Sequence, residues 1–138
     1  MSTVTEADPP GRVIEQASSG FWAAIDAGAL ALSRCRRCGN SSLLEQACIG
    51  CGARDRDWQP ASGRGRVTAV AIFHRPYHPF WYGRVPYAVV AVELEEGPLL
   101  IVNLEGREPG DIRVGDPVRI EVRQRGGQSI PAAVPADN

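Results

Sequence analysis

Polar and apolar residues change their pattern near residue 64 of this 138-residue chain. Beyond that point, four segments alternate in polarity or are rich in β-branched and apolar residues, which is typical of strands. We predict strands over 64–73, 87–94, 99–104 and 118–123. Glycine and proline lie in the turns between them, and the whole pattern favours a small antiparallel barrel.

The strand predicted over 87–94 is apolar on both faces. Ala88, Val90, Val92 and Leu94 lie on one face, and Tyr87, Val89 and Ala91 on the other. A strand with one face in water normally carries polar residues there, so we expect the second face to be covered. The cysteine-containing segment or a partner subunit could cover it.

The N-terminal half predicts one short helix. Phe21 and Ile25 lie four positions apart, with Trp22 beside them, and Gly28 is a natural helix end. This helix either packs on its own domain or docks on a partner. We expect a disordered N-terminus over 1–17, helix and lead-in strand over 18–33, a cysteine ribbon over 34–58, the barrel over 59–125 and a flexible tail over 126–138.

All four cysteines fall in two C-x-x-C pairs, Cys35/Cys38 and Cys48/Cys51. Two such pairs facing each other make a tetrahedral thiolate site, so we expect a structural zinc ribbon; an iron site of the rubredoxin type uses the same spacing. Disulfides are the third alternative. Residues 1–10 do not resemble a secretory signal, and we therefore expect a reducing, cytoplasmic location, where paired thiols usually bind metal. Gly39 and Gly52 suit turns that need positive φ.

The net charge is −1, which argues against a general nucleic-acid binder. No apolar run approaches the ~20 residues that span a bilayer, so we expect no membrane segment. Seven of the fifteen basic residues, all arginines, lie between positions 34 and 66. They either balance the negative charge of a metal with four thiolates or form a phosphate-binding edge.

Residues 73–87 form an aromatic loop between the first two predicted barrel strands. They contain six of the nine aromatic residues, both histidines and three prolines. Such a loop either contacts a partner or ligand, or folds back to plug its own barrel. His74 and His78 have no nucleophile beside them in any recognisable motif, so an independent enzyme that uses either histidine is a lesser hypothesis.

The order of motifs resembles the zinc-ribbon OB-fold family called domain of unknown function 35, the acyl-CoA-associated OB-fold proteins. The resemblance covers about residues 20–123. It is carried by Phe21-Trp22, the two cysteine pairs, Trp58, and the segments 61–65, 74–78, 86–89, 95–98 and 112–118.

This resemblance implies a mainly β protein with a short N-terminal helix, a rubredoxin-like zinc ribbon and an OB-fold barrel. It also implies a structural Zn²⁺ and a hetero-oligomer with a thiolase-like catalytic subunit of the lipid-transfer-protein type, which supplies the catalytic residues. Family members accompany thiolases, acyltransferases and aldolases that shorten steroid side chains, and some accompany enoyl-CoA hydratases. Acyl-CoA is then a shared ligand, and the small subunit organises the complex.

Under this hypothesis the candidate residues form three groups. The metal ligands are Cys35, Cys38, Cys48 and Cys51, and the candidates for CoA phosphates are Arg36, Arg37, Arg54, Arg64 and Arg75, with Arg84 as a further one. The candidates for partner or acyl contacts are Phe21, Trp22, His74, Tyr77, His78, Phe80, Trp81 and Tyr82. The alternative function is a nucleic-acid-binding protein built from a ribbon and a barrel.

Overall fold

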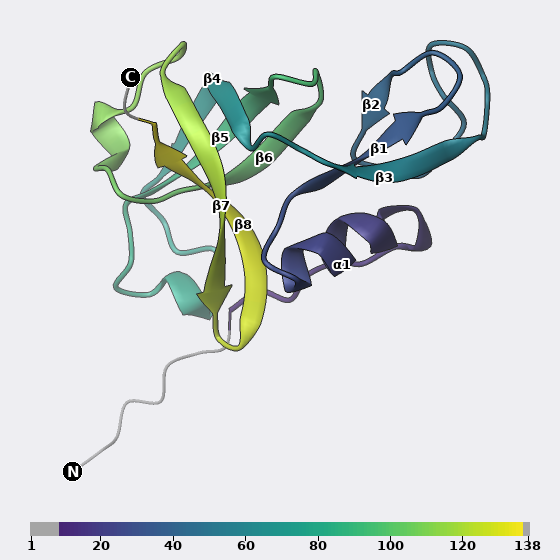
Figure 1. Cartoon of the computed structure of the whole chain (residues 1–138). Helices are drawn as coiled ribbons and strands as arrows, with labels where there is room; N and C mark the ends of the chain where they lie inside the picture. Colours follow the sequence, from purple (N-terminus) through teal and green to yellow (C-terminus); the bar gives the residue numbers. More distant parts are fainter. Residues whose placement is uncertain (1–8, 137–138) are drawn as a thin grey trace.

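Within residues 9–136, the chain folds into two β structures, one α-helix and three short 3-10 helices (Figure 1). The structure is a computed structural model, which describes residues 9–136. The smaller β structure is a three-stranded antiparallel sheet in the order β2-β1-β3, and it carries the cysteines. Its strands are β1 (Ala31–Cys35), β2 (Ser41–Ser42) and β3 (Arg56–Pro60).

The larger structure is a closed barrel in the order β4-β5-β6-β8-β7. Its strands are β4 (Arg64–Phe73), β5 (Tyr87–Leu94), β6 (Leu99–Leu104), β7 (Pro117–Arg125) and β8 (Gln128–Pro135). Two short 3-10 helices, η2 (Pro79–Trp81) and η3 (Pro109–Asp111), lie in its loops. β4 pairs with β5 along its length and with β7 at three positions, Arg64 to Arg66, and this second pairing closes the barrel. The expected fold class is confirmed: a mainly β chain with a short helix, an OB-like barrel and a cysteine cluster that is compatible with a zinc ribbon.

The barrel core follows the alternation of the strands. The face of β5 that carries Ala88, Val90, Val92 and Leu94 is no more than 2% exposed, as expected from the sequence. Val67 of β4 and Val118 of β7 belong to the same core, at 1% exposed each. Burial of such side chains contributes about 1.5–3 kcal/mol each, so these strands hold the barrel together.

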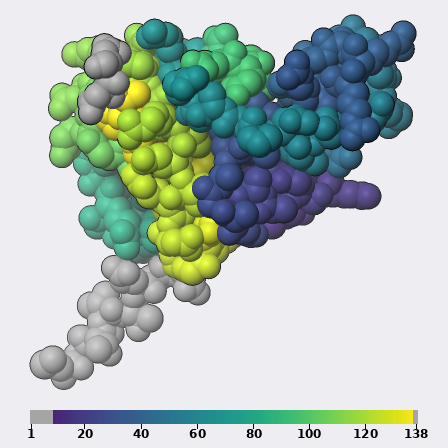
Figure 2. All heavy atoms as spheres, viewed as in Figure 1, coloured from purple at the N-terminus to yellow at the C-terminus, as the bar shows by residue number. Residues whose placement is uncertain are grey.

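Helix α1 (Ser19–Asp26), which follows the 3-10 helix η1 (Gln16–Ser18), connects the cysteine-bearing sheet with the barrel. It contacts β1 and β8, and Figure 2 shows it against the yellow strand β8 while the sheet projects to the upper right. Phe21 and Ile25 face inward at 6% and 0% exposed. The indole of Trp58 lies directly against Gly20, where no side chain would fit. None of the helices within residues 9–136 has the length and apolar character needed to cross a bilayer.

The C-terminal region differs from the expected flexible tail. Gly126 and Gly127, with φ of 58° and 80°, form a tight hairpin turn, and Gln128–Pro135 continues as β8. β8 pairs with β7 along its length but with β6 only at two positions, Asn103↔Ala132 and Leu104↔Ala133. Pro131 and Pro135 are therefore tolerated, because the side of the strand that they would leave without a donor has no partner strand there.

The N-terminal segment also differs from the disorder expected over 1–17. Residues 1–8 lie outside the described part of the chain. Further along, the Arg12 guanidinium donates to Asp26 Oδ1 at 2.6 Å and to the Ser129 carbonyl at 3.0 Å. It also lies over the Trp22 ring at 5.0 Å. These contacts tie the segment before η1 to both α1 and β8.

Candidate metal centre and surrounding surfaces

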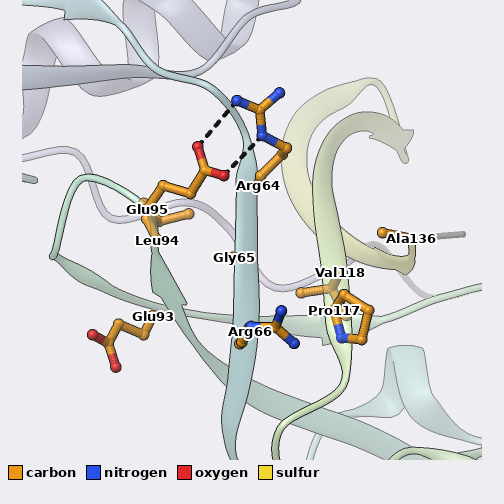
Figure 3. A pocket seen from close by; sticks show the side chains of 9 residues that line it. All are labelled: Arg64, Gly65, Arg66, Glu93, Leu94, Glu95, Pro117, Val118 and Ala136. Atoms are coloured by element: carbon orange, nitrogen blue, oxygen red, sulfur yellow. Dashed lines mark hydrogen bonds and ion pairs between the residues drawn. The ribbon is translucent and has the colours of Figure 1, made fainter. Parts of the chain in front are cut away.

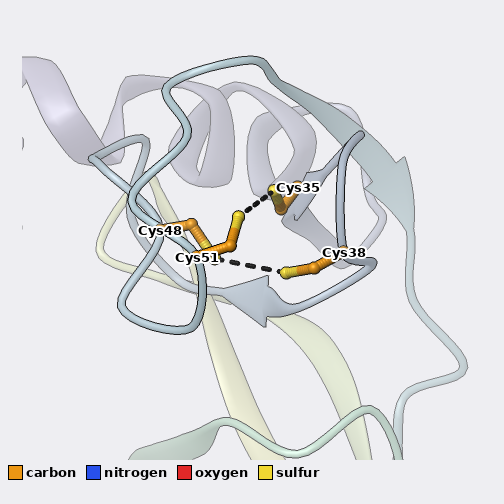
Figure 4. A group of neighbouring side chains, drawn as sticks. All are labelled: Cys35, Cys38, Cys48 and Cys51. Atoms are coloured by element: carbon orange, nitrogen blue, oxygen red, sulfur yellow. Dashed lines mark hydrogen bonds between the residues drawn. The ribbon is translucent and has the colours of Figure 1, made fainter.

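The four cysteine sulfurs meet in one cluster (Figure 4). All Sγ atoms lie within 4.8 Å of one another, with Cys35 Sγ 3.7 Å from Cys51 Sγ and Cys38 Sγ 3.5 Å from Cys48 Sγ. Sulfurs about 2.3 Å from a tetrahedral Zn²⁺ lie about 3.8 Å apart, so the observed spacing fits such an ion. A disulfide needs about 2.05 Å, and none of the cysteines forms one.

Each cysteine pair is held by a tight glycine turn. The N–H of Gly39 donates to the Cys35 carbonyl at 2.9 Å, and that of Gly52 donates to the Cys48 carbonyl at 2.7 Å. Both glycines have positive φ, 82° and 77°, as predicted. The N–H of Gly50 also donates to Cys48 Sγ at 3.3 Å, which places one thiolate before any metal binds.

The electrostatics of the cluster favour its deprotonated form at two of the four thiols. Burial raises the pKa of Cys48, but N–H donors from Cys51 and Gly50 outweigh that effect and lower the pKa to about 6. A backbone hydrogen bond at Cys38 likewise lowers the pKa of Cys35. In contrast, the pKa of Cys38 rises to about 11. The backbone N–H of Asn40 lowers this pKa, but the hydrogen bond to Cys48, burial and the hydrogen bonds to Cys51 and Cys35 together outweigh that effect. The thiols therefore share protons, which a metal ion would displace.

Arg56 holds the first cysteine turn in place, a role that its sequence context did not indicate. Its side chain is 8% exposed and donates to Ser33 Oγ and the Ser33 carbonyl at 2.8 Å each, and to the Asn40 carbonyl at 3.1 Å. Asn40 in turn accepts from the N–H of Cys35 at 2.8 Å. One buried guanidinium thus connects β3, β1 and the turn that carries Cys35, a candidate metal ligand.

The candidate phosphate-binding arginines are not all together. Arg36 and Arg37 line one hollow beside Cys38, joined there by Arg34, which was not among the candidates. Arg36 is also paired with Asp55 and Asp57, at 3.3 and 3.7 Å.

The remaining candidates lie elsewhere. Arg64 forms a two-pronged ion pair with Glu95 at 2.9 and 3.1 Å, at the start of β4 (Figure 3). This pair raises the pKa of Arg64 and lowers the pKa of Glu95. Arg54 and Arg75 are exposed and do not line the hollow beside Cys38, and Arg84 lies over the Phe80 ring at 4.4 Å. The structure therefore brings together two of the five candidates.

The aromatic loop uses its central residues inside the chain. Phe80 is only 9% exposed, and Trp81 stacks on Tyr87 with ring centroids 3.9 Å apart. The Arg125 guanidinium lies over both rings, at 5.5 and 5.2 Å. His78 Nδ1 accepts from the N–H of Phe80 at 3.1 Å and so caps η2.

The predicted contact residues thus fall into three groups. Phe21 and Phe80 are buried, so the structure gives them a packing role in place of the predicted partner contact. Trp22, His78 and Trp81 are half-buried. Tyr77 and Tyr82 are exposed, at 73% and 66%, and His74 is exposed as well; these three remain available to a partner or ligand.

Together, these features define a small protein built from a four-cysteine ribbon and an OB barrel. The family described as "ChsH2, C-terminal OB-fold domain" matches residues 58–123. A solved structure titled "Ltp2-ChsH2(DUF35) aldolase" matches with a TM-score of 0.83 and 30% identity, over 92% of this chain and 100% of that one. The chain belongs to the DUF35 family of OB-fold proteins.

Two curated relatives add to this assignment. A "DUF35 domain-containing scaffold protein" of Pyrococcus furiosus is 34% identical over 91 residues, which are 64% of this chain and 66% of the relative. A "Probable enoyl-CoA hydratase alpha subunit" of Thermomonospora curvata is 36% identical over 107 residues, 75% of this chain but only 32% of the relative. The chain therefore spans about a third of the length of the hydratase subunit.

Proposed function

We propose that this chain is a non-catalytic, zinc-binding subunit of a thiolase-like acyl-CoA enzyme. The observation that carries the proposal is the match to the whole DUF35 chain of the Ltp2-ChsH2 aldolase, together with the scaffold protein of Pyrococcus furiosus. The complex would form or break a carbon–carbon bond next to a thioester, by Claisen or retro-aldol chemistry. From the family resemblance, the acyl group proposed is a steroid or another lipid side chain.

In this proposal the cysteine cluster has a structural task. Four thiolates fill the tetrahedral coordination of Zn²⁺, so the bound ion would have no open position for a substrate. Cys35, at the end of β1, and Cys48 are buried. The cluster fixes the turn between Cys35 and Cys38, which carries Arg36 and Arg37. The ion would thereby set the position of the arginine-lined hollow relative to α1 and the barrel.

The hollow beside Cys38 is the part of the chain best suited to CoA phosphates. Arg34, Arg36 and Arg37 line it, and guanidinium groups bind phosphate through paired, charge-assisted hydrogen bonds. Arg36 already contacts Asp55 and Asp57, so a phosphate there would compete with two carboxylates. Arg37 is therefore the proposed principal contact, and Tyr77 and Tyr82 are the proposed contacts to the partner or acyl chain.

Co-expression with the thiolase-like protein encoded beside this chain's gene tests the proposal. We expect the two proteins to co-purify, and we expect acyl-CoA turnover to require both. The isolated chain should have no turnover, and His74→Ala should leave turnover by the complex within about twofold. Separate elution of the two proteins, with full activity of the thiolase-like protein alone, would exclude this function.

A second candidate is a companion of an enoyl-CoA hydratase. It is favoured by the alignment with the hydratase alpha subunit, which covers 107 residues, more than the scaffold protein does. A hotdog-fold hydratase partner would then add water to an enoyl-CoA. One assay distinguishes the two candidate functions. A hydratase complex would decrease the absorbance of the enoyl-CoA without cleaving a carbon–carbon bond.

A further inference from the structure

On the outside of the barrel, the outward residues of β7 are charged. Its outward residues Arg119, Glu121 and Arg123 form ion pairs of 3.5 Å and 3.0 Å along the strand, and Arg123 also pairs with Glu105 at 3.1 Å. β7 and β8 lie on the side of the molecule seen in Figure 2. Alternation of inward apolar and outward charged residues is the normal pattern of a solvated sheet face.

In the middle of β4, β5 and β6 the outward positions are apolar, between the outward polar pair Arg66 and Glu93 at one end and Asn103 of β6 at the other. The register places Ala69 beside Ala91 and Ala91 beside Ile101, and it places Ala71 beside Val89 in the next outward row. Ile101 is 72% exposed and Leu99 is 55% exposed. We call this surface the outer sheet face, and its members are Ala69, Ala71, Val89, Ala91, Leu99 and Ile101.

The outer sheet face continues into the aromatic loop. Phe73, the next outward residue of β4 after Ala71, stacks on Tyr87 with centroids 5.0 Å apart and planes 9° apart. Tyr77 contacts the edge of Phe73 at 6.1 Å and is itself exposed. The apolar surface therefore runs from the middle of β6 across β5 and β4 to Tyr77 in the loop that follows β4.

The area of the outer sheet face limits which kind of partner can cover it. Three strands about 5 Å apart, over roughly 20 Å of strand length, give about 300 Å². Two copies packed face to face would bury about 600 Å² in total, well below the ~1,200 Å² of a stable specific interface. Two copies would also meet with the convex outsides of their barrels, which touch over a limited area, whereas a partner with a concave surface can cover both the sheet and the exposed tyrosines.

We propose that the outer sheet face is the docking surface for the catalytic subunit of the acyl-CoA enzyme, an inference that rests on the proposed function. The matching surface of the partner is aliphatic or aromatic. Exposed Glu93 faces outward between Arg66 and Leu99, so this edge of the face carries both charges and the matching edge of the partner is polar. Ile101, at 72%, is more exposed than Leu99 at 55%, so a charge at Ile101 meets the partner directly.

The test is a pair of matched charge substitutions. Ile101→Glu places a carboxylate on the face, whereas Val114→Glu places one at an equally exposed apolar residue, 67%, in the loop before β7. Each tagged variant is co-expressed with the thiolase-like protein encoded beside the gene, and the Kd of the purified pair is measured. We expect Ile101→Glu to raise the Kd at least 30-fold and Val114→Glu to change it less than twofold. Leu99→Glu is the second variant on the face, should Ile101→Glu lower the melting temperature.

Each other outcome has a distinct meaning. If the wild-type chain binds and both face variants bind equally well, the docking surface lies elsewhere and the proposed function stands. If the wild-type chain does not bind its neighbour, the proposed function fails and this inference fails with it. If the chain alone sediments as a dimer that Ile101→Glu dissociates, a second copy covers the face and the inference is wrong.

Discussion

Replacement of Arg56 by alanine tests how the cysteine ribbon is held. The side chain makes three hydrogen bonds of 2.8–3.1 Å inside the ribbon, all from one charged group. Net contributions of about 1–1.5 kcal/mol per bond give a loss of about 4 kcal/mol, a large part of the 5–15 kcal/mol that stabilises a typical domain. For a chain of this size, the melting temperature should fall on the order of 10 °C.

The assay combines urea unfolding with zinc release to a colorimetric chelator. Because Asn40 accepts from both Arg56 and the N–H of Cys35, we expect the variant to release zinc faster as well as to unfold earlier. Arg54→Ala, at an exposed position in the same ribbon, should change stability by less than about 0.5 kcal/mol. Arg56→Lys should be intermediate, since lysine keeps the charge but lacks the planar fork. An Arg56→Ala variant as stable as the Arg54→Ala control would refute this account of the ribbon.

Three further predictions concern the metal, the helix and the aromatic loop. Cys48→Ser should abolish stoichiometric zinc binding and unfold at least the ribbon, as measured by metal analysis and circular dichroism. Gly20→Ala should cost about 1–3 kcal/mol in urea unfolding, because the new methyl group meets the Trp58 ring. The Tyr77→Ala/Tyr82→Ala double variant should weaken partner binding at least tenfold, with an unchanged melting temperature, since both side chains are exposed.

Each of these predictions has its own control. Zinc at one equivalent and unchanged melting in Cys48→Ser would contradict the metal assignment. Gly110→Ala is the control for the helix, because nothing lies within 4 Å of the added methyl there and its φ is not positive. Equal stability of Gly20→Ala and Gly110→Ala would show that the helix adjusts freely. Full partner affinity of the double tyrosine variant would remove the aromatic loop from the interface.

The sequence predicted the elements that depend on local pattern. The inward face of β5 follows from simple alternation, and the cysteine cluster follows from two C-x-x-C pairs. β8 was missed although Gly126-Gly127 is a strong hairpin signal. The segment contains two prolines and few large apolar residues, so it lacks the usual sequence pattern of a strand. It is a strand because it pairs with β6 and β7, and such pairing between distant segments cannot be read from local sequence.

The roles of individual side chains were harder to predict. Arg56 lies in a run of charged residues, a pattern that is typical of solvent-exposed surface. Its burial depends on a hydrogen bond to Ser33, 23 residues away in the sequence. In the aromatic loop, no periodicity tells which rings face inward. Trp81 packs back onto the chain because it stacks on Tyr87, and the Arg125 guanidinium lies over both Phe80 and Trp81. Arg125 is more than 40 residues away in the sequence, so the loop sequence alone does not reveal these contacts.

The most direct test of the proposed function is the mass of the assembly that this chain forms. The tagged chain is co-expressed with the thiolase-like protein encoded beside its gene, and the purified material is analysed by sedimentation velocity and metal content. We predict one hetero-oligomeric species that contains both proteins, with one zinc per copy of this chain. Two separately sedimenting proteins at micromolar concentration would contradict the proposal that this chain is the organising subunit of such an enzyme.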